Sequence, residues 1–485
     1  MSVRRSLVWS YGGQMTTLVV TFATSIVVAR SLAPREMGIY ALAVAVSGVL
    51  GVFLTFGTQA YLVREEALDP RAVRSAFTVN LLLSLILSSC LAIAGLAELA
   101  WQQSELAIVF FIMAIGPLFS AFEFIPVALF MRDMRYDVIS AVSVLRAITT
   151  AVVTLSFVLS GSGAPGLAVG PVAANLLCSL TFMLLRRRDL VFRPGFYQFR
   201  TIMVFGVQML SISGVAQLAQ RSSDIILGQM LGLAALGLYA RASGLATLIF
   251  LNVYGLATGV IFVQLSRDLR EKGEMHQTFV RALRMITGAM WPLLIGIAVL
   301  AGPLVLTLYG AKWLPAALPL ALLMIAQFIV LGFGMNWELF VLRQETGRQT
   351  KIELTRAVIG TVIFAIGCMF GIAAAALGRI GEALVGYILY RPHIDRLAGT
   401  VPGEIRGIYA ESLQLTAVAV APAVAVMAWW HWSPHVPLPL AGAAIMLGIL
   451  GWFAILYKRR HPIAQEVMLL ARTIGRLIPA PRGRT

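Results

Sequence analysis

The segment VAQLAQRSSDIILGQM, residues 215–230, carries Arg221 and Asp224 inside an otherwise apolar run. A charge at the centre of an inserted helix costs roughly 2.5–3.5 kcal/mol, whereas a Leu or Ile returns only about 0.3–0.6 kcal/mol. An arginine has a specific use there, because its planar, permanently charged guanidinium binds phosphate through two parallel hydrogen bonds. Asp224 lies three residues after Arg221, a helical spacing that suits an ion pair in which the acid orients the arginine. The pair therefore indicates binding of an anionic group.

Arg221 and Asp224 belong to a polar stripe along one face of a predicted helix. At 100° per residue the stripe covers an arc of about 100° and consists of Ser213, Gln217, Gln220, Arg221 and Asp224. The first apolar segment carries a similar stripe of about 80°, made of Ser10, Gln14, Thr17, Thr21 and Ser25. In a bilayer such a face must meet protein or a water-filled cavity. The stripes predict either a hydrated central cavity or polar contacts that hold helices together.

Further cations flank the same segments. Arg241, in the next segment, shares a helical face with Asn252, and Arg30 ends the first segment. A cavity rich in arginine and poor in acids suits an anionic substrate. Because Arg241 and Arg30 are close to the outer ends of their helices, snorkelling to the membrane interface is the alternative interpretation.

Two acid–arginine pairs are predicted from depth alone. Glu123 and Arg146 each lie about nine residues from the turn MRDMRYD, on adjacent antiparallel helices, so they share a depth. Glu338 and Arg356 stand in the same relation around Gly347. Each pair is expected to be a structural ion pair, and a proton- or cation-responsive gate is the alternative.

The elements that must position these residues are membrane helices. Apolar residues form 59% of the 485-residue chain and charged residues 12%, against roughly 45–50% and 25% in soluble domains. The fold class predicted is an all-α, polytopic membrane protein. Fourteen spans are expected at about residues 9–32, 38–62, 76–100, 106–130, 138–160, 164–185, 202–231, 236–263, 279–301, 315–342, 352–376, 379–398, 407–430 and 437–457.

The chain contains an internal repeat. GIYALAVAVSG, from Gly38, resembles GLYARASGLAT, from Gly237, and GGQM at 12–15 resembles GVQM at 206–209. Six helices separate the copies, so both have the same orientation, as in a two-lobed transporter. The domains expected are an N-lobe at 1–200, a C-lobe at 201–400, two further helices at 401–460 and a basic cytoplasmic tail at 461–485.

The net charge of +16 is distributed as a membrane topology requires, and not as nucleic-acid binding requires. Of the 38 Lys and Arg residues, 28 lie at the termini or in loops on their side, and 4 lie in the opposite loops. Positively charged loops stay inside, so both termini are expected in the cytoplasm. No GxxxxGK[ST] phosphate loop occurs in the sequence, and no ATPase activity, cofactor or metal site is expected.

Five motifs, in order along the chain, resemble the Wzx-type oligosaccharide flippases and related exopolysaccharide exporters of the multidrug/oligosaccharidyl-lipid/polysaccharide exporter superfamily. They are ARSLAPREMGIYALA at 29–43, RDMRYD at 132–137, RSSDIILGQMLGLAALGLYARASGLA at 221–246, LYGAKWLPAAL at 308–318 and GRQTKIELTRAVI at 347–359. The resemblance implies a V-shaped bundle of two six-helix lobes that opens alternately to each side. It also implies a polyprenyl-pyrophosphate-linked glycan as cargo, moved to the periplasmic leaflet of the inner membrane, with a polysaccharide polymerase and export machinery as partners. Cationic cavity residues in such proteins match Arg221, and more weakly Arg30 and Arg241.

Three other functions remain open at this point. A cation-coupled multidrug exporter is expected to expose carboxylates in its cavity and usually has twelve helices. A flippase for a lipid-linked peptidoglycan precursor is poorly separated from a glycan flippase by sequence. A membrane glycosyltransferase or ligase needs a large outer loop, and none of the loops expected here is long enough.

The charge bias predicts the topology directly. Reporter fusions after Arg188 and after Tyr457 should report a cytoplasmic location, and fusions near Trp101 or Gly163 a periplasmic one. A tail that reports a periplasmic location would mean a helix count wrong by an odd number, with the segment 300–315 as the first place to look.

Overall fold

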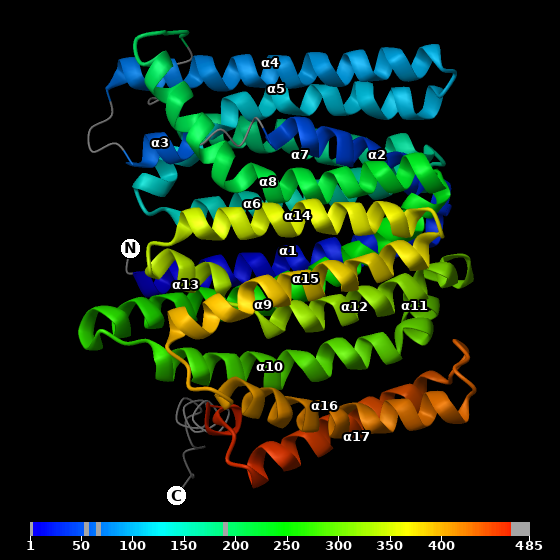
Figure 1. Cartoon of the computed structure of the whole chain (residues 1–485). Coiled ribbons are helices and arrows are strands. Elements are labelled where there is room, and N and C mark those ends of the chain that lie inside the picture. The colour runs from blue at the N-terminus through cyan, green and yellow to red at the C-terminus, as the bar shows by residue number, and fades with distance from the viewer. Residues whose placement is uncertain (1–2, 53–57, 65–68, 188–192, 467–485) are drawn as a thin grey trace, which may run out of the picture. The chain divides into compact units, whose positions relative to one another are not determined.

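A computed structural model describes residues 3–52, 58–64, 69–187 and 193–466 (Figure 1). Within these ranges the regular structure is helical, so the all-α class is confirmed. Eleven of the described segments are long and apolar enough to cross a membrane. The other predicted spans correspond to α2 with α3, to α8 and to α14, so the structure is consistent with fourteen.

Tertiary contacts divide the chain into two compact units, Met1–Ala240 and Arg241–Thr485. The first unit contains α1 (Val3–Ser31), α2 (Pro34–Gly51), α3 (Thr58–Arg64), α4 (Pro70–Ala100), α5 (Ser104–Arg132), α6 (Tyr136–Leu159), α7 (Gly163–Leu185), α8 (Phe199–Leu231) and the start of α9 (Leu233–Lys272). This division differs from the lobe boundary expected at residue 200. The reason is that α8 packs against α2, α3 and α4, although the repeat assigns it to the second half of the sequence.

Helix α5 is the centre of the first unit. It packs against α2, α3, α4, α6 and α7, and Figure 1 shows it running beside α4. Its mean hydropathy of 2.2 equals that of α4. Both helices are therefore apolar enough to contact lipid on one side and other helices on the other. A cluster of buried side chains from α3, α4, α5 and α8, including Phe77, Ile125 and Ile202, fixes α3 against this hairpin.

The second unit consists of the rest of α9 and of the helices that follow. They are α10 (His276–Val299), α11 (Ala301–Tyr309), the 3₁₀ helix η2 (Ala311–Ala316), α12 (Ala317–Gly332), α13 (Asn336–Leu342), α14 (Thr346–Cys368), α15 (Ile372–Ala398), α16 (Glu404–Trp429) and α17 (Leu438–Lys458). The two helices expected at 401–460 correspond to α16 and α17, and α16 packs on α10 and on α17. The segment 300–315, between the ninth and tenth expected spans, forms α11 and most of η2. The two helices are joined at Gly310, which has a φ of +94°.

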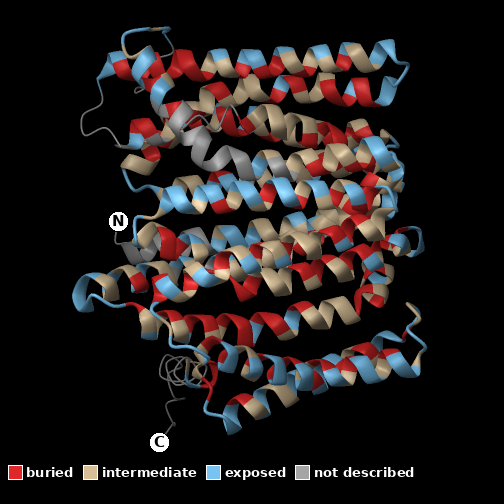
Figure 2. Cartoon of the chain, in the orientation of Figure 1, coloured by how far each residue is buried: buried red, intermediate tan, exposed pale blue. Residues whose placement is uncertain are grey.

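The outward faces of the helices are apolar. Figure 2 shows exposed residues along much of α14 and α17, and many of them are large hydrophobic side chains such as Val358, Val362, Leu447 and Leu450. A soluble protein rarely exposes so much contiguous apolar surface, whereas contact with lipid tails explains it.

The two segments of the expected repeat cross at paired glycines. A Cβ placed on Gly38 would lie 1.7 Å from the carbonyl oxygen of Leu233, and one on Gly237 would lie 1.9 Å from the carbonyl oxygen of Pro34. Each glycine thus contacts the residue four positions before the other. Such reciprocity is the pattern of a two-fold contact, in which residue i meets j and j meets i. The crossing supports the repeat and shows why both copies carry glycine.

Adding one methyl group at this crossing should separate the two backbones. We expect Gly38→Ala and Gly237→Ala each to lower stability by about 1–3 kcal/mol or more, because a backbone carbonyl cannot move aside as a side chain can. Gly244→Ala is the matched control, since nothing lies within 4 Å of its added Cβ. The control should match or exceed the wild type, because alanine favours a helix by about 1 kcal/mol. The measurement is the apparent melting temperature of the purified protein. Equal values for Gly38→Ala and Gly244→Ala would contradict the crossing.

Candidate functional site

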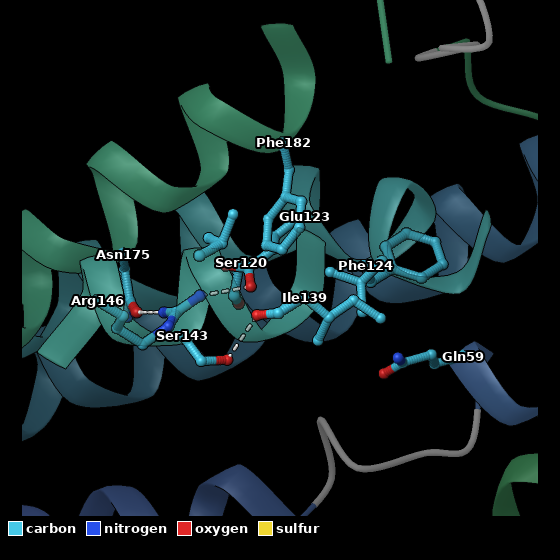
Figure 3. Close-up of a pocket in the computed structure, with 11 residues that line it drawn as sticks. Gln59, Ser120, Glu123, Phe124, Ile139, Ser143, Arg146, Asn175 and Phe182 are labelled. Atoms are coloured by element: carbon cyan, nitrogen blue, oxygen red, sulfur yellow. Dashed lines mark hydrogen bonds and ion pairs between the residues drawn. The ribbon is translucent and has the colours of Figure 1, made fainter. Parts of the chain in front are cut away.

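A polar cavity of about 390 Å³ lies inside the first unit (Figure 3). It is lined by residues from α3, α5, α6 and α7, namely Gln59, Ser120, Glu123, Phe124, Val127, Ile139, Val142, Ser143, Arg146, Asn175 and Phe182. Two of these eleven residues are charged, and they are the pair predicted from depth. The cavity therefore forms around Glu123 and Arg146.

The predicted contact between Glu123 and Arg146 is confirmed. The Nη2 atom of Arg146 lies 2.5 Å from Oε1 of Glu123, and its Nη1 atom donates a hydrogen bond to Oδ1 of Asn175 (Figure 3). The side chains of Arg146 and Glu123 are 34% and 18% exposed, so the pair borders the cavity rather than filling a sealed core. A guanidinium bound on two sides to oxygen acceptors is held in one orientation.

The turn between α5 and α6 places the two residues at the same depth. The helices end and begin at Arg132 and Tyr136, and Met134 has a positive φ of 55° that makes the reversal tight. Asn175 comes from α7 and was missed in the sequence. A polar amide in the middle of the apolar run GPVAANLLCS is the feature that could have identified it.

The second predicted pair is wrong. Arg356 forms ion pairs with Glu353 and, at 2.8 Å, with Glu382 of α15, whereas Glu338 is not among its partners. Glu382 also binds Arg379 at 2.6 Å. Equal distance from a turn determines depth but not direction around the helix. The guanidinium of Arg356 faces α15, where a closer carboxylate is available.

Arg221 is half-buried and rests on the neighbouring helix α2. A Cβ added at Gly48 would lie 2.7 Å from its Nε atom, so the arginine stem uses the space that this glycine leaves. Within the described part of the chain, Arg221 has no ion pair, and its expected pairing with Asp224 is not formed. The reason is the direction of the side chain, which extends toward α2 rather than along its own helix.

The other residues that the sequence predicts to line a substrate cavity differ in their exposure. Gln217, Gln14 and Arg30 are exposed, and Asp224 is half-buried. Ser213, Gln220 and Asn252 lie outside the described side chains.

Arg241 lies beneath an aromatic pair. Its Cζ atom is 5.0 Å from the ring centre of Tyr309 and 5.5 Å from that of Trp313. These distances fit cation–π contacts. The contacts attach the turn of the motif LYGAKWLP to α9, which explains the aromatic residues of the motif.

A double-mutant cycle tests the Glu123–Arg146 pair. Removing one partner leaves a charge unpaired. Breaking a fully buried pair costs about 3–5 kcal/mol, and the partial exposure of this pair lowers the cost. Glu123→Gln alone should therefore lower the melting temperature more than Glu123→Gln combined with Arg146→Gln. Asp137→Asn breaks the exposed pair with Arg135 and should cost no more than about 1 kcal/mol. Strictly additive losses at 123 and 146 would exclude energetic coupling between them.

Comparisons with known proteins agree with this architecture. The succinoglycan biosynthesis transport protein ExoT of Rhizobium meliloti (strain 1021) is 23% identical over 493 aligned positions, which cover 97% of this chain and 96% of that protein. The teichuronic acid biosynthesis protein TuaB of Bacillus subtilis (strain 168) is 29% identical over 116 residues, or 24% of each chain.

A solved structure, the lipid II flippase MurJ in an inward closed conformation, has the same fold. The TM-score is 0.71 at 15% identity, with 93% of this chain and 99% of that chain covered. The family model described as polysaccharide biosynthesis protein matches residues 27–318, which is more than half of the sequence. The chain therefore belongs to the polysaccharide biosynthesis protein family, as a multi-pass membrane protein.

Proposed function

We propose that the protein is an alternating-access transporter that flips a polyprenyl-pyrophosphate-linked oligosaccharide across the bacterial inner membrane. Its cargo moves from the cytoplasmic to the periplasmic leaflet for the synthesis of a surface polysaccharide. The family supports this function, and so does the alignment with a succinoglycan transport protein over nearly the whole of both chains. A charged headgroup cannot cross about 30 Å of hydrocarbon unaided, so its passage needs a polar path.

The distribution of positive charge supports the orientation. The loops that carry most of the Lys and Arg residues belong on the cytoplasmic side, together with both termini. The proposed partners follow from the proposed function. They are membrane lipids, the lipid-linked glycan, and a polysaccharide polymerase with its export machinery on the periplasmic side.

The observation that carries the proposal is the state of Arg221. It is half-buried on a membrane helix, its stem is positioned by Gly48, and among the described residues no carboxylate neutralises it. A charge kept in such a place is a functional residue by default. The pyrophosphate of the cargo supplies the missing anion, and a guanidinium can bind it with two hydrogen bonds.

The alternative cargoes are less well supported. The fold is shared with a lipid II flippase, and a fold alone does not identify a cargo. The relatives named for succinoglycan and teichuronic acid biosynthesis favour a polysaccharide precursor over a peptidoglycan precursor or a drug.

Substitution of Arg221 tests the proposal. Hydrogen bonds to charged groups contribute about 1.5–3 kcal/mol, so Arg221→Ala should reduce export by about tenfold or more. Arg221→Lys keeps the charge but loses the planar guanidinium that makes two parallel hydrogen bonds, so it should retain part of the activity. The measurement is the amount of lipid-linked glycan that accumulates on the cytoplasmic leaflet, normalised to the level of the protein in the membrane.

Two further variants separate positioning from charge. Gly48→Ala should weaken export through displacement of the Arg221 stem, while the charge itself is kept. Arg135→Ala removes an exposed arginine outside the site and should export as the wild type does. Full export by well-expressed Arg221→Ala would remove the phosphate role and leave helix packing as the explanation of this residue.

A further inference from the structure

The polar cavity of the first unit contains hydrogen-bonding groups that the protein leaves unused. The guanidinium of Arg146 donates from Nη1 to Asn175 and from Nη2 to Glu123, and in the described structure its Nε–H has no partner. Glu123 accepts through Oε1, so its Oε2 atom has no partner among the described residues. Both open atoms are accessible to solvent rather than sealed by packing. The pair therefore presents one donor and one acceptor to a ligand.

A third open group comes from α3, on another side of the cavity. The amide of Gln59 donates at 3.2 Å to the Sδ atom of Met131, and a thioether sulfur is a weak acceptor. Its carbonyl oxygen has no partner in the part of the chain that the structure describes. Figure 3 shows this side chain apart from the group around Arg146, with its amide end turned toward that group. Gln59 therefore adds an amide that is free to bind a ligand.

The charges in the cavity cancel each other. Glu123 and Arg146 are the two charged residues among the eleven that line it, and they bind each other. An ion of either sign would lose its hydration and gain little from a neutral pair. The open groups include both donors and acceptors, so they suit a neutral ligand whose groups donate and accept hydrogen bonds. Hydroxyl groups have this property.

The size and the apolar walls of the cavity restrict the ligand further. Its volume of about 390 Å³ far exceeds the ~30 Å³ of one water molecule and lies near the lower end of the roughly 300–1,000 Å³ of small-molecule sites. The remaining walls are aromatic and aliphatic, and they consist of Phe124, Val127, Ile139, Val142 and Phe182. A sugar ring has hydroxyl groups at its edge and C–H groups on its faces. One such ring therefore matches both the volume and the mixed lining.

We propose that this cavity is a subsite for one neutral sugar unit of the cargo, bound through its hydroxyl groups by Gln59, Glu123 and Arg146. The inference rests on the proposed function for the identity of the cargo, whereas binding of a sugar does not require transport. The subsite would distinguish glycans that carry the same pyrophosphate. Discrimination is strong at such a site, because an analogue that lacks a hydroxyl leaves the polar groups of the protein unpaired.

Saturation-transfer NMR tests the binding without any transport. The probes are the methyl glycosides of glucose, galactose and mannose, added to the purified full-length protein in lipid nanodiscs. At least one of them should bind. Glucuronate and glucosamine carry a charge that must be desolvated beside a neutral pair, so they should bind about tenfold more weakly or worse than the matching neutral glycoside. Failure of all three glycosides to bind, or equal binding of the charged sugars, would overturn the proposal.

Two variants place the sugar in this cavity. Gln59→Leu removes the amide at similar size and loses one weak contact to Met131, so binding should weaken about three- to tenfold in a folded protein. Val127→Phe fills the cavity without removing a polar group and should abolish binding. Gln103→Leu makes the first substitution at an exposed position outside the cavity and should bind as the wild type does. Unchanged binding by both cavity variants would mean that the sugar binds elsewhere.

Export in cells tests whether the subsite serves transport. Gln59→Leu should lower export of the glycan about three- to tenfold at a normal membrane level, and Gln103→Leu should not. Wild-type export by Gln59→Leu would overturn the role of the cavity in binding the cargo. If the wild type exports no glycan, the proposed function fails, while the NMR result still decides whether the cavity binds a sugar. If the wild type exports glycan but binds none of the glycosides, the subsite alone fails.

Discussion

An uncompensated charge inside a membrane is the constraint on which the arrangement of this protein depends. Because the interior offers little solvation, each buried ionisable group needs a partner, a proton or a ligand. The structure shows charged partners in two forms. Glu123 and Arg146 form a single pair, and Arg356 belongs to a network with more than one carboxylate. Arg221 has neither form of partner among the described residues, and this is why the proposed function centres on it.

Glycines supply the space in which these groups and helices are placed. At Gly38 and Gly237 the absent side chains let two helix starts approach within contact of each other's carbonyl groups. At Gly48 the absent side chain leaves room for the stem of Arg221. Small residues play this part widely in membrane proteins, where close backbone approach replaces a hydrophobic driving force between helices. Packing and the proposed binding of phosphate therefore depend on the same kind of residue.

Prediction from the sequence succeeded for one ion pair and failed for another on the same argument. Both hairpins turn at a residue with positive φ, Met134 and Gln344, so the turn does not distinguish them. Depth was sufficient for Glu123 and Arg146 because their side chains point toward each other. For Glu338 and Arg356 the same count overlooked Glu382, which is 26 residues further along the chain from Arg356 and faces it from α15. Two residues at one depth meet only if their side chains point toward each other. The direction is a property of the packed helices and not of spacing.

The sequence by itself determined the helical class and the positions of eleven of the fourteen expected spans, and it predicts the charge asymmetry and the repeat. These features follow from hydrophobic length and charge along the chain, and both can be read one segment at a time. The tertiary structure alone decided that α8 packs with the first unit, that Arg241 lies under Tyr309 and Trp313, and that Glu338 has no counter-ion among the described residues. Each of these facts depends on which surfaces meet, and helices of similar apolar composition leave that choice to the fit of individual side chains.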